Sequence, residues 1–148
     1  MSENKNELII LIAEDDPDDR LLIKEALEEV KLSNPLHFVE DGIELLDYLK
    51  RQNNFHKLAG TTLPGLILLD LNMPRKNGIE ALQEIKEDPE LRKVPVVVFT
   101  TSKAEEDINK AYRLGVNSFI TKPVNFQALL NTLEILAKYW FNIVELPR

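Results

Sequence analysis

The sequence predicts an α/β fold in which five βα units form a doubly wound, parallel five-stranded sheet. The first observation behind this prediction is a set of short aliphatic runs, at 8–13, 66–69 and 94–99, each followed at once by polar residues. Such runs are typical of strands buried on both faces of a sheet. The second observation is that segments with helical spacing of apolar residues alternate with these runs. This alternation favours a parallel sheet covered by helices.

The first two units occupy the N-terminal third of the chain. After the strand at 8–13, Asp16 and Pro17 are typical of a helix N-terminus, because Asp caps free N–H groups and Pro is tolerated in the first turn. A second strand is expected at 36–39, and a helix with apolar residues at 43–49 follows it.

A polar segment at 52–65, rich in turn-forming residues, precedes the strand at 66–69. A connection of this length is unusual in a compact domain, so we expect a functional or mobile loop. The remaining elements follow in the same alternating order. They are a helix around 79–85, the strand at 94–99, a helix carrying Ile108 to Leu114 with capping-box spacing at Ser102 and Glu105, a strand at 118–121 and a helix at 125–141.

Composition restricts the class of protein. The length of 148 residues suits one domain, which we place at 8–141 between a polar N-terminal arm (1–7) and a C-terminal tail (142–148). The net charge of −7 argues against a nucleic-acid binder, and the absence of Cys excludes disulfides and thiolate metal sites. The polar N-terminus lacks the apolar core of a signal peptide, and no apolar run is long enough for a membrane helix. We therefore expect a soluble cytoplasmic protein that binds neither nucleic acid nor membranes.

Polar side chains follow four of the five expected strands. Right-handed crossovers place the carboxyl ends of parallel strands at one edge of the sheet, where ligands bind. The residues brought to this edge are Asp15, Asp16, Asp70, Thr100 and Lys122. Clustered carboxylates repel one another unless a cation is present, and oxygen ligands without His or Cys favour Mg²⁺. Lys122 and Thr100 are suited to holding phosphoryl oxygens, and Asp70 offers a nucleophile.

The set formed by Asp15-Asp16, Asp70, Thr100 and Lys122-Pro123 resembles the receiver domain of two-component response regulators, over about 8–139. The resemblance implies a flavodoxin-like receiver fold with strand order 2-1-3-4-5. It also implies a regulator that accepts a phosphoryl group from a sensor histidine kinase onto Asp70 in a Mg²⁺-dependent reaction. Such a phosphoacceptor catalyses its own phosphotransfer and slow autodephosphorylation. Because no output domain follows Arg148, we expect signalling through protein contact or onward phosphotransfer.

The resemblance assigns roles to individual residues. It implies that Asp16 and Asp70 bind Mg²⁺ directly, that Asp15 binds it through water, and that the carbonyl of Asn72 completes the ligand set. The residues implied to bind the phosphoryl group are Thr100, Thr101 and Lys122, and those implied to form the conformational switch are Thr100 and Phe119. Asp18 and Asp19 are expected only to favour the N-terminus of their helix electrostatically.

A narrower resemblance is to the stand-alone regulators of cyanobacterial and bacterial phytochrome kinases, through the 52–65 loop and the tail. Two alternatives remain open at this point. One is an aspartate-nucleophile phosphatase, although Asp70-Leu71-Asn72 lacks the second acid of an Asp-x-Asp motif. The other is a receiver-like scaffold that is not regulated by phosphorylation.

The last helix carries two apolar strips, whereas a surface helix needs only one. The second strip contains Ala128, Thr132, Ile135 and Tyr139, and the tail adds Ile143 and Val144. We expect a homodimer through Ile135, Tyr139, Ile143 and Val144. The alternative is that the tail folds back over the second strip within one chain.

Overall fold

The computed structural model describes residues 8–140, and in these residues five parallel strands form one sheet in the order β2-β1-β3-β4-β5. The strands are β1 (Ile10–Ala13), β2 (Leu36–Val39), β3 (Leu66–Leu69), β4 (Val96–Thr100) and β5 (Ser118–Thr121). The α-helices are α1 (Pro17–Glu29), α2 (Gly42–Lys50), α3 (Gly78–Glu87), α4 (Glu105–Arg113) and α5 (Phe126–Lys138). The predicted five βα units and the implied strand order are both confirmed.

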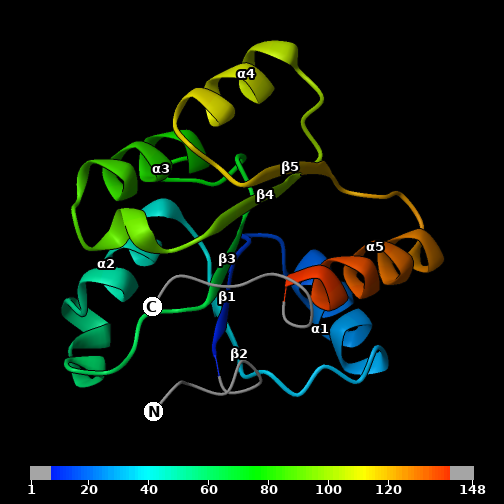
Figure 1. Cartoon of the computed structure of the whole chain (residues 1–148), viewed down its shortest axis with the longest axis horizontal. Helices are drawn as coiled ribbons and strands as arrows, with labels where there is room; N and C mark the ends of the chain where they lie inside the picture. The colour runs from blue at the N-terminus through cyan, green and yellow to red at the C-terminus, as the bar shows by residue number, and fades with distance from the viewer. Residues whose placement is uncertain (1–7, 141–148) are drawn as a thin grey trace.

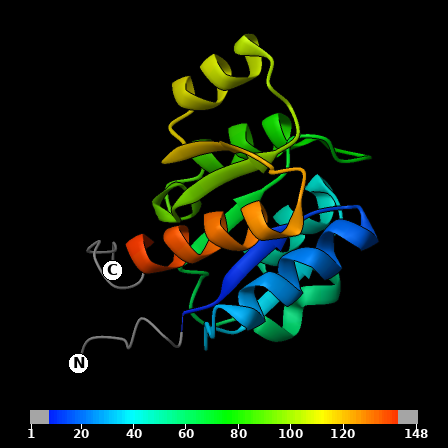
Figure 2. The same ribbon diagram turned by 90° about the vertical axis from the view of Figure 1, so that its right-hand side faces the viewer.

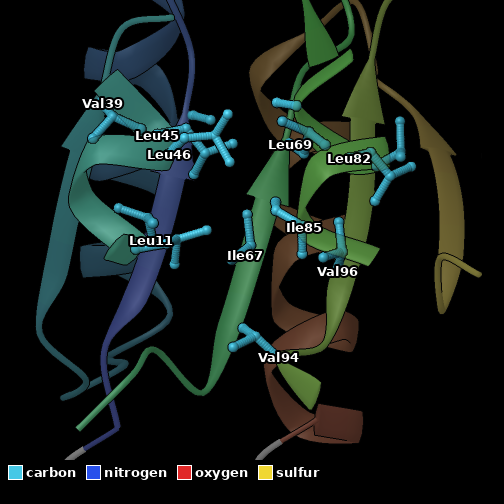
Figure 3. Close-up of a cluster of buried hydrophobic side chains, with 14 of the residues drawn as sticks. Leu11, Val39, Leu45, Leu46, Ile67, Leu69, Leu82, Ile85, Val94 and Val96 are labelled. Carbon is cyan, nitrogen blue, oxygen red and sulfur yellow. The ribbon is translucent and has the colours of Figure 1, made fainter. Parts of the chain in front are cut away.

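Helices cover both faces of the sheet (Figure 1). Helices α1 and α5 lie side by side on one face, while α2, α3 and α4 cover the other (Figure 2). Alternate residues of the central strands point to opposite faces, as the pleat of a strand requires. Leu11 and Ile67 join the core cluster beneath α2 and α3 (Figure 3), whereas Ile12 and Leu68 join the cluster beneath α1 and α5. Two buried faces explain why these strands read as continuous aliphatic runs.

The register of the parallel strands decides which polar residues become neighbours. Ala13 of β1 aligns with Leu69 of β3, so the residues that follow them, Glu14 and Asp70, begin their loops at the same level. In the same way Leu69 aligns with Val98 of β4. The carboxyl ends of these strands therefore meet at one edge of the sheet.

The segment at 52–65, which the sequence predicted to be a functional or mobile loop, contains a short 3₁₀ helix, η2 (Asn53–Leu58). Phe55 and Leu58 pack against the core cluster on the α2 side, so part of this segment contributes to the core. The Arg51 guanidinium donates to the carbonyls of Tyr48 and Thr62, at 2.7 and 2.9 Å, and ties the start of the segment to its end.

The expected N-termini of the helices are mostly confirmed. The Asn125 side chain accepts a hydrogen bond from the N–H of Ala128 and caps α5. The predicted capping box at Ser102 and Glu105 is wrong, because α4 begins after Ala104, which provides no side-chain cap. A second short 3₁₀ helix, η3 (Leu91–Lys93), links α3 to β4. Within residues 8–140, none of the helices has the length and apolar character needed to cross a membrane.

Candidate functional site

Asp70 lies directly after β3 and is 6% exposed. Its Oδ1 accepts hydrogen bonds from the Thr100 hydroxyl, at 2.7 Å, and from the Asn72 backbone N–H, at 3.1 Å. Its Oδ2 accepts from the Lys122 Nζ at 3.1 Å. The structure therefore brings together the three residues that the sequence placed at this edge from β3, β4 and β5.

Three carboxylates converge at the same point. Oxygen atoms of Glu14, Asp15 and Asp70 all lie within 4.8 Å of one another. Glu14 and Asp15 are the first two residues after β1, and the register of β1 with β3 places them beside Asp70. An arrangement of oxygen ligands at this separation suits a hard divalent cation.

The sequence-based choice of Asp16 as a metal ligand is not supported by this arrangement. Asp16 is exposed, and its side chain accepts hydrogen bonds from the N–H groups of Asp18 and Asp19. The prediction that Asp16 caps the first helix is thus confirmed, and Asp16 is not among the acids whose oxygens converge. Glu14, which the sequence analysis did not select, lies in the cluster with Asp15 and Asp70. Pro17 could have indicated this in the sequence. A Pro at the first helical position favours the preceding residue as the helix cap, so the Asp16 carboxylate is engaged by α1.

Lys122 supplies the positive charge of the site. Its Nζ contacts the carboxylates of Glu14, Asp70 and Asp19, the last at 3.2 Å. The contact with Asp19 was also missed, since the sequence assigned that residue only to the helix N-terminus. Burial works to lower the pKa of Lys122, but hydrogen bonds and charge from Glu14 and Asp70 outweigh it and raise the pKa. The ammonium therefore stays charged at every physiological pH.

The pKa of Glu14 is raised in this cluster. Burial is the largest influence on its carboxyl group, and the neighbouring Asp70 charge acts in the same direction. The hydrogen bond from Lys122 opposes both but does not cancel them, so the pKa of Glu14 rises to about 7. A bound cation would remove this penalty, because it favours the ionised form of every carboxylate around it. The cluster therefore offers oxygen atoms suited to a divalent ion, and such an ion would stabilise the ionised form of Glu14.

The other predicted residues lie close to this group. Asn72 follows Asp70 in the loop that leads to α3, and Thr101 is exposed next to Thr100. Phe119 is partly buried in β5 and packs against the core cluster beneath α3. Its backbone N–H donates to the hydroxyl of Tyr112 on α4, at 3.1 Å. The roles implied for Asn72, Thr101 and Phe119 remain predictions.

Residues 10–134 match the family described as the response regulator receiver domain, and the chain belongs to that family. It is a response regulator of two-component signal transduction, as the resemblance implied. Among its relatives is the response regulator Rcp1 of Synechocystis sp., with 37% identity over 148 residues that cover 99% of both chains.

Solved structures give the same result. The crystal structure of the phosphorylated cyanobacterial phytochrome response regulator RcpA is similar with a TM-score of 0.88 and 39% identity, covering 96% of this chain and 99% of that one. The Mn²⁺-bound form of Rcp1 has a TM-score of 0.86 and 37% identity, covering 95% and 99%. These matches give no support to the alternative of an aspartate-nucleophile phosphatase.

The raised pKa of Glu14 predicts a pH-dependent stability in the absence of divalent ions. Because the folded protein holds this proton up to about pH 7 and the unfolded chain releases it near 4.5, Glu14 destabilises the fold as pH rises through that window. Glu14→Gln should therefore gain stability relative to wild type between pH 5 and pH 8, measured by urea unfolding in the presence of a chelator. A difference between the two proteins that stays constant with pH would contradict the raised pKa.

Proposed function

We propose that Asp70 is the residue that accepts the phosphoryl group from a sensor histidine kinase. The observation that supports this most directly is the contact of one buried carboxylate with both Lys122 and Thr100, beside two further acids. In the transfer, an oxygen of Asp70 attacks phosphorus and forms an acyl phosphate. The bond from phosphorus to the donor nitrogen breaks, and the leaving imidazole keeps the electron pair.

Lys122 and Thr100 stabilise the transferred group in this proposal. Both already donate hydrogen bonds to Asp70, so both are within reach of oxygens on a phosphoryl group attached there. Fixed donors aimed at developing charge are the main source of catalysis in phosphoryl transfer. Thr101 is exposed beside them and would provide a further donor.

We propose Mg²⁺ as the cofactor, held by the carboxylates of Glu14, Asp15 and Asp70 and by the carbonyl of Asn72. Bound there, Mg²⁺ supplies positive charge to the carboxylates and the phosphoryl oxygens. The cluster of oxygen ligands supports a divalent ion in general, and the relative Rcp1 has been solved with Mn²⁺. Glu14 replaces Asp16 in this proposal.

Phosphorylation is proposed to act through Thr100 and Phe119. In the described structure the Thr100 hydroxyl donates to Asp70. A phosphoryl oxygen would take over this hydrogen bond and draw the hydroxyl inward, which frees space for the neighbouring Phe119 ring. Such a local change biases a two-state element, here the β4–α4 loop and β5.

The kinase is proposed to dock on α1 and the start of α5, beside Asp70. Leu21 of α1 is 55% exposed, and Val124, in the loop that leads into α5, is 100% exposed. Helices α1 and α5 lie side by side (Figure 2). Apolar patches rimmed by polar residues are typical of protein interfaces. Since RcpA is a phytochrome response regulator, we propose a phytochrome kinase as the donor, acting in the cytoplasm.

The phosphoacceptor is tested with acetyl phosphate and Mg²⁺. Wild type should gain one phosphoryl group, and Asp70→Asn should gain none because the amide is not a nucleophile. Intact-mass spectrometry measures the gain. Asp88→Asn, which changes an acid at the opposite end of α3, serves as the control and should behave as wild type. Phosphorylation that persists on Asp70→Asn would disprove the assignment.

The metal ligands are tested by calorimetric titration with Mg²⁺. Glu14→Gln should weaken binding by about tenfold or more, because the loss of even an outer-shell partner of a metal ligand costs about that much. Asp16→Asn should leave the affinity within about twofold, because Asn still caps α1 and the carboxylate is not a ligand. An equal loss in both variants would restore Asp16 to the ligand set.

We also propose that the protein forms a homodimer through the outer side of α5. On this helix Leu129 and Leu133 are buried against the sheet, whereas Ile135 and Tyr139 are 68% and 52% exposed. An exposed apolar strip of this kind favours a symmetric partner surface. Ile143 and Val144, the other residues expected in the interface, lie outside the described residues.

Sedimentation velocity tests the dimer. Wild type should associate at micromolar concentration. The double variant Ile135→Asp and Tyr139→Asp should be monomeric, because it replaces two apolar contacts of the proposed interface by carboxylates that repel one another. Leu21→Asp adds one negative charge on α1, outside the proposed interface, and should not change the association. A wild-type protein that remains monomeric before and after phosphorylation would rule the dimer out.

A further inference from the structure

The loop at 71–77 joins β3 to α3 and is held tightly against Asp70 at its two ends. The Asn72 N–H donates to Asp70 Oδ1 at 3.1 Å, and the Gly78 N–H donates to the Leu71 carbonyl at 3.0 Å. A Cβ added at Gly78 would lie 2.4 Å from the Asp70 carbonyl oxygen, so only glycine permits this close approach. Any shift of the loop would therefore move backbone that contacts the phosphoacceptor.

The middle of the same loop is attached to the N-terminus of α2. The Arg75 guanidinium donates to both carboxylate oxygens of Asp41, through Nε at 2.8 Å and through a terminal nitrogen at 3.1 Å. Next to this pair, the Gly42 N–H donates to the Lys76 carbonyl at 2.9 Å. A Cβ at Gly42 would lie 2.3 Å from that oxygen, so the loop rests directly on the helix.

The Asp41 side chain is held in place by hydrogen bonds from two parts of the chain. Asp41 is buried, and its side chain also accepts from the Glu44 N–H at 2.8 Å as the cap of α2. Burial works to raise the pKa of Asp41, but the hydrogen bonds from Arg75 and Glu44 outweigh it and lower the pKa. Arg75 has a φ of 64°, a left-handed conformation that is unfavourable for most residues. The paired hydrogen bonds to Asp41 offset this cost.

We propose that Asp41 and Arg75 are positioning residues for phosphoryl transfer, which anchor the 71–77 loop on α2 and so hold the Asn72 backbone at Asp70. The inference rests on the proposed function of Asp70 and of the Asn72 carbonyl. Displacement of a positioned group by as little as 1 Å slows catalysis markedly. The ion pair would thus act on the site through the backbone, without touching substrate.

Two asparagine substitutions separate this mechanism from simple electrostatics. Asp41→Asn keeps a good helix cap, and Arg75→Asn tolerates the left-handed backbone, so both variants should fold. They change the net charge in opposite directions. If charge alone mattered, Asp41→Asn would weaken Mg²⁺ binding and Arg75→Asn would strengthen it. If the anchor matters, both should weaken it.

We expect calorimetry to show that each variant binds Mg²⁺ about tenfold more weakly. This is the smaller end of the loss of metal affinity seen when a residue that supports a metal ligand is removed. The double variant should lose no more than either single variant, because the anchor is lost only once. In ion-free protein, the amides at 72–78 should exchange hydrogen faster in all three variants. Asp88→Asn and Arg92→Asn make the same charge changes at the far end of α3 and should change neither measurement.

Affinity changes of opposite sign in Asp41→Asn and Arg75→Asn would overturn the inference, as would unchanged affinity and exchange in both. An equal effect of the two controls would also overturn it. These results are separable from a failure of the proposed function. A wild-type protein that neither binds Mg²⁺ nor accepts a phosphoryl group would remove the proposed function, and this inference with it.

Discussion

The contact of the Lys122 ammonium with the carboxylates at the sheet edge is the interaction on which the site depends. The strands end at one level, so Glu14, Asp15 and Asp70 must share a small volume. Burial, together with the charge of Asp70, raises the pKa of Glu14 to about 7, even with Lys122 present. Lys122 follows β5, the last strand of the sheet. The charge balance of the site is therefore complete only when the whole sheet has formed.

Asp70 is contacted by different groups on its two sides. Towards α2 and α3, the 71–77 loop is fixed by Gly78 and by the pair of Arg75 and Asp41. Towards α4 and β5, Thr100 and Lys122 each donate a hydrogen bond to Asp70, and the Phe119 N–H donates to Tyr112. Asp70 therefore contacts the backbone of the 71–77 loop on one side and the side chains of Thr100 and Lys122 on the other.

The fold was readily predicted because its signals are local. Buried strands give uninterrupted aliphatic runs such as Leu66–Leu69, and their alternation with helical patterns leaves few topologies. The segment at 52–65 was less predictable. Its 3₁₀ helix has little periodicity of its own and is stabilised by Phe55 and Leu58 packing on the α2 side of the core. That packing surface is formed by residues distant in the sequence.

The sequence by itself determined the parallel sheet, the edge at which the site lies, and the identity of Asp70, Thr100 and Lys122, because each of these lies at the carboxyl end of a strand. The tertiary structure alone decided which acids join them. Strand register and the cap of α1 place Glu14 in the cluster and Asp16 outside it, and the first turn of α1 brings Asp19 to Lys122. Side-chain direction at the start of a loop depends on the backbone that follows, so a run of adjacent acids does not show which of them face the site.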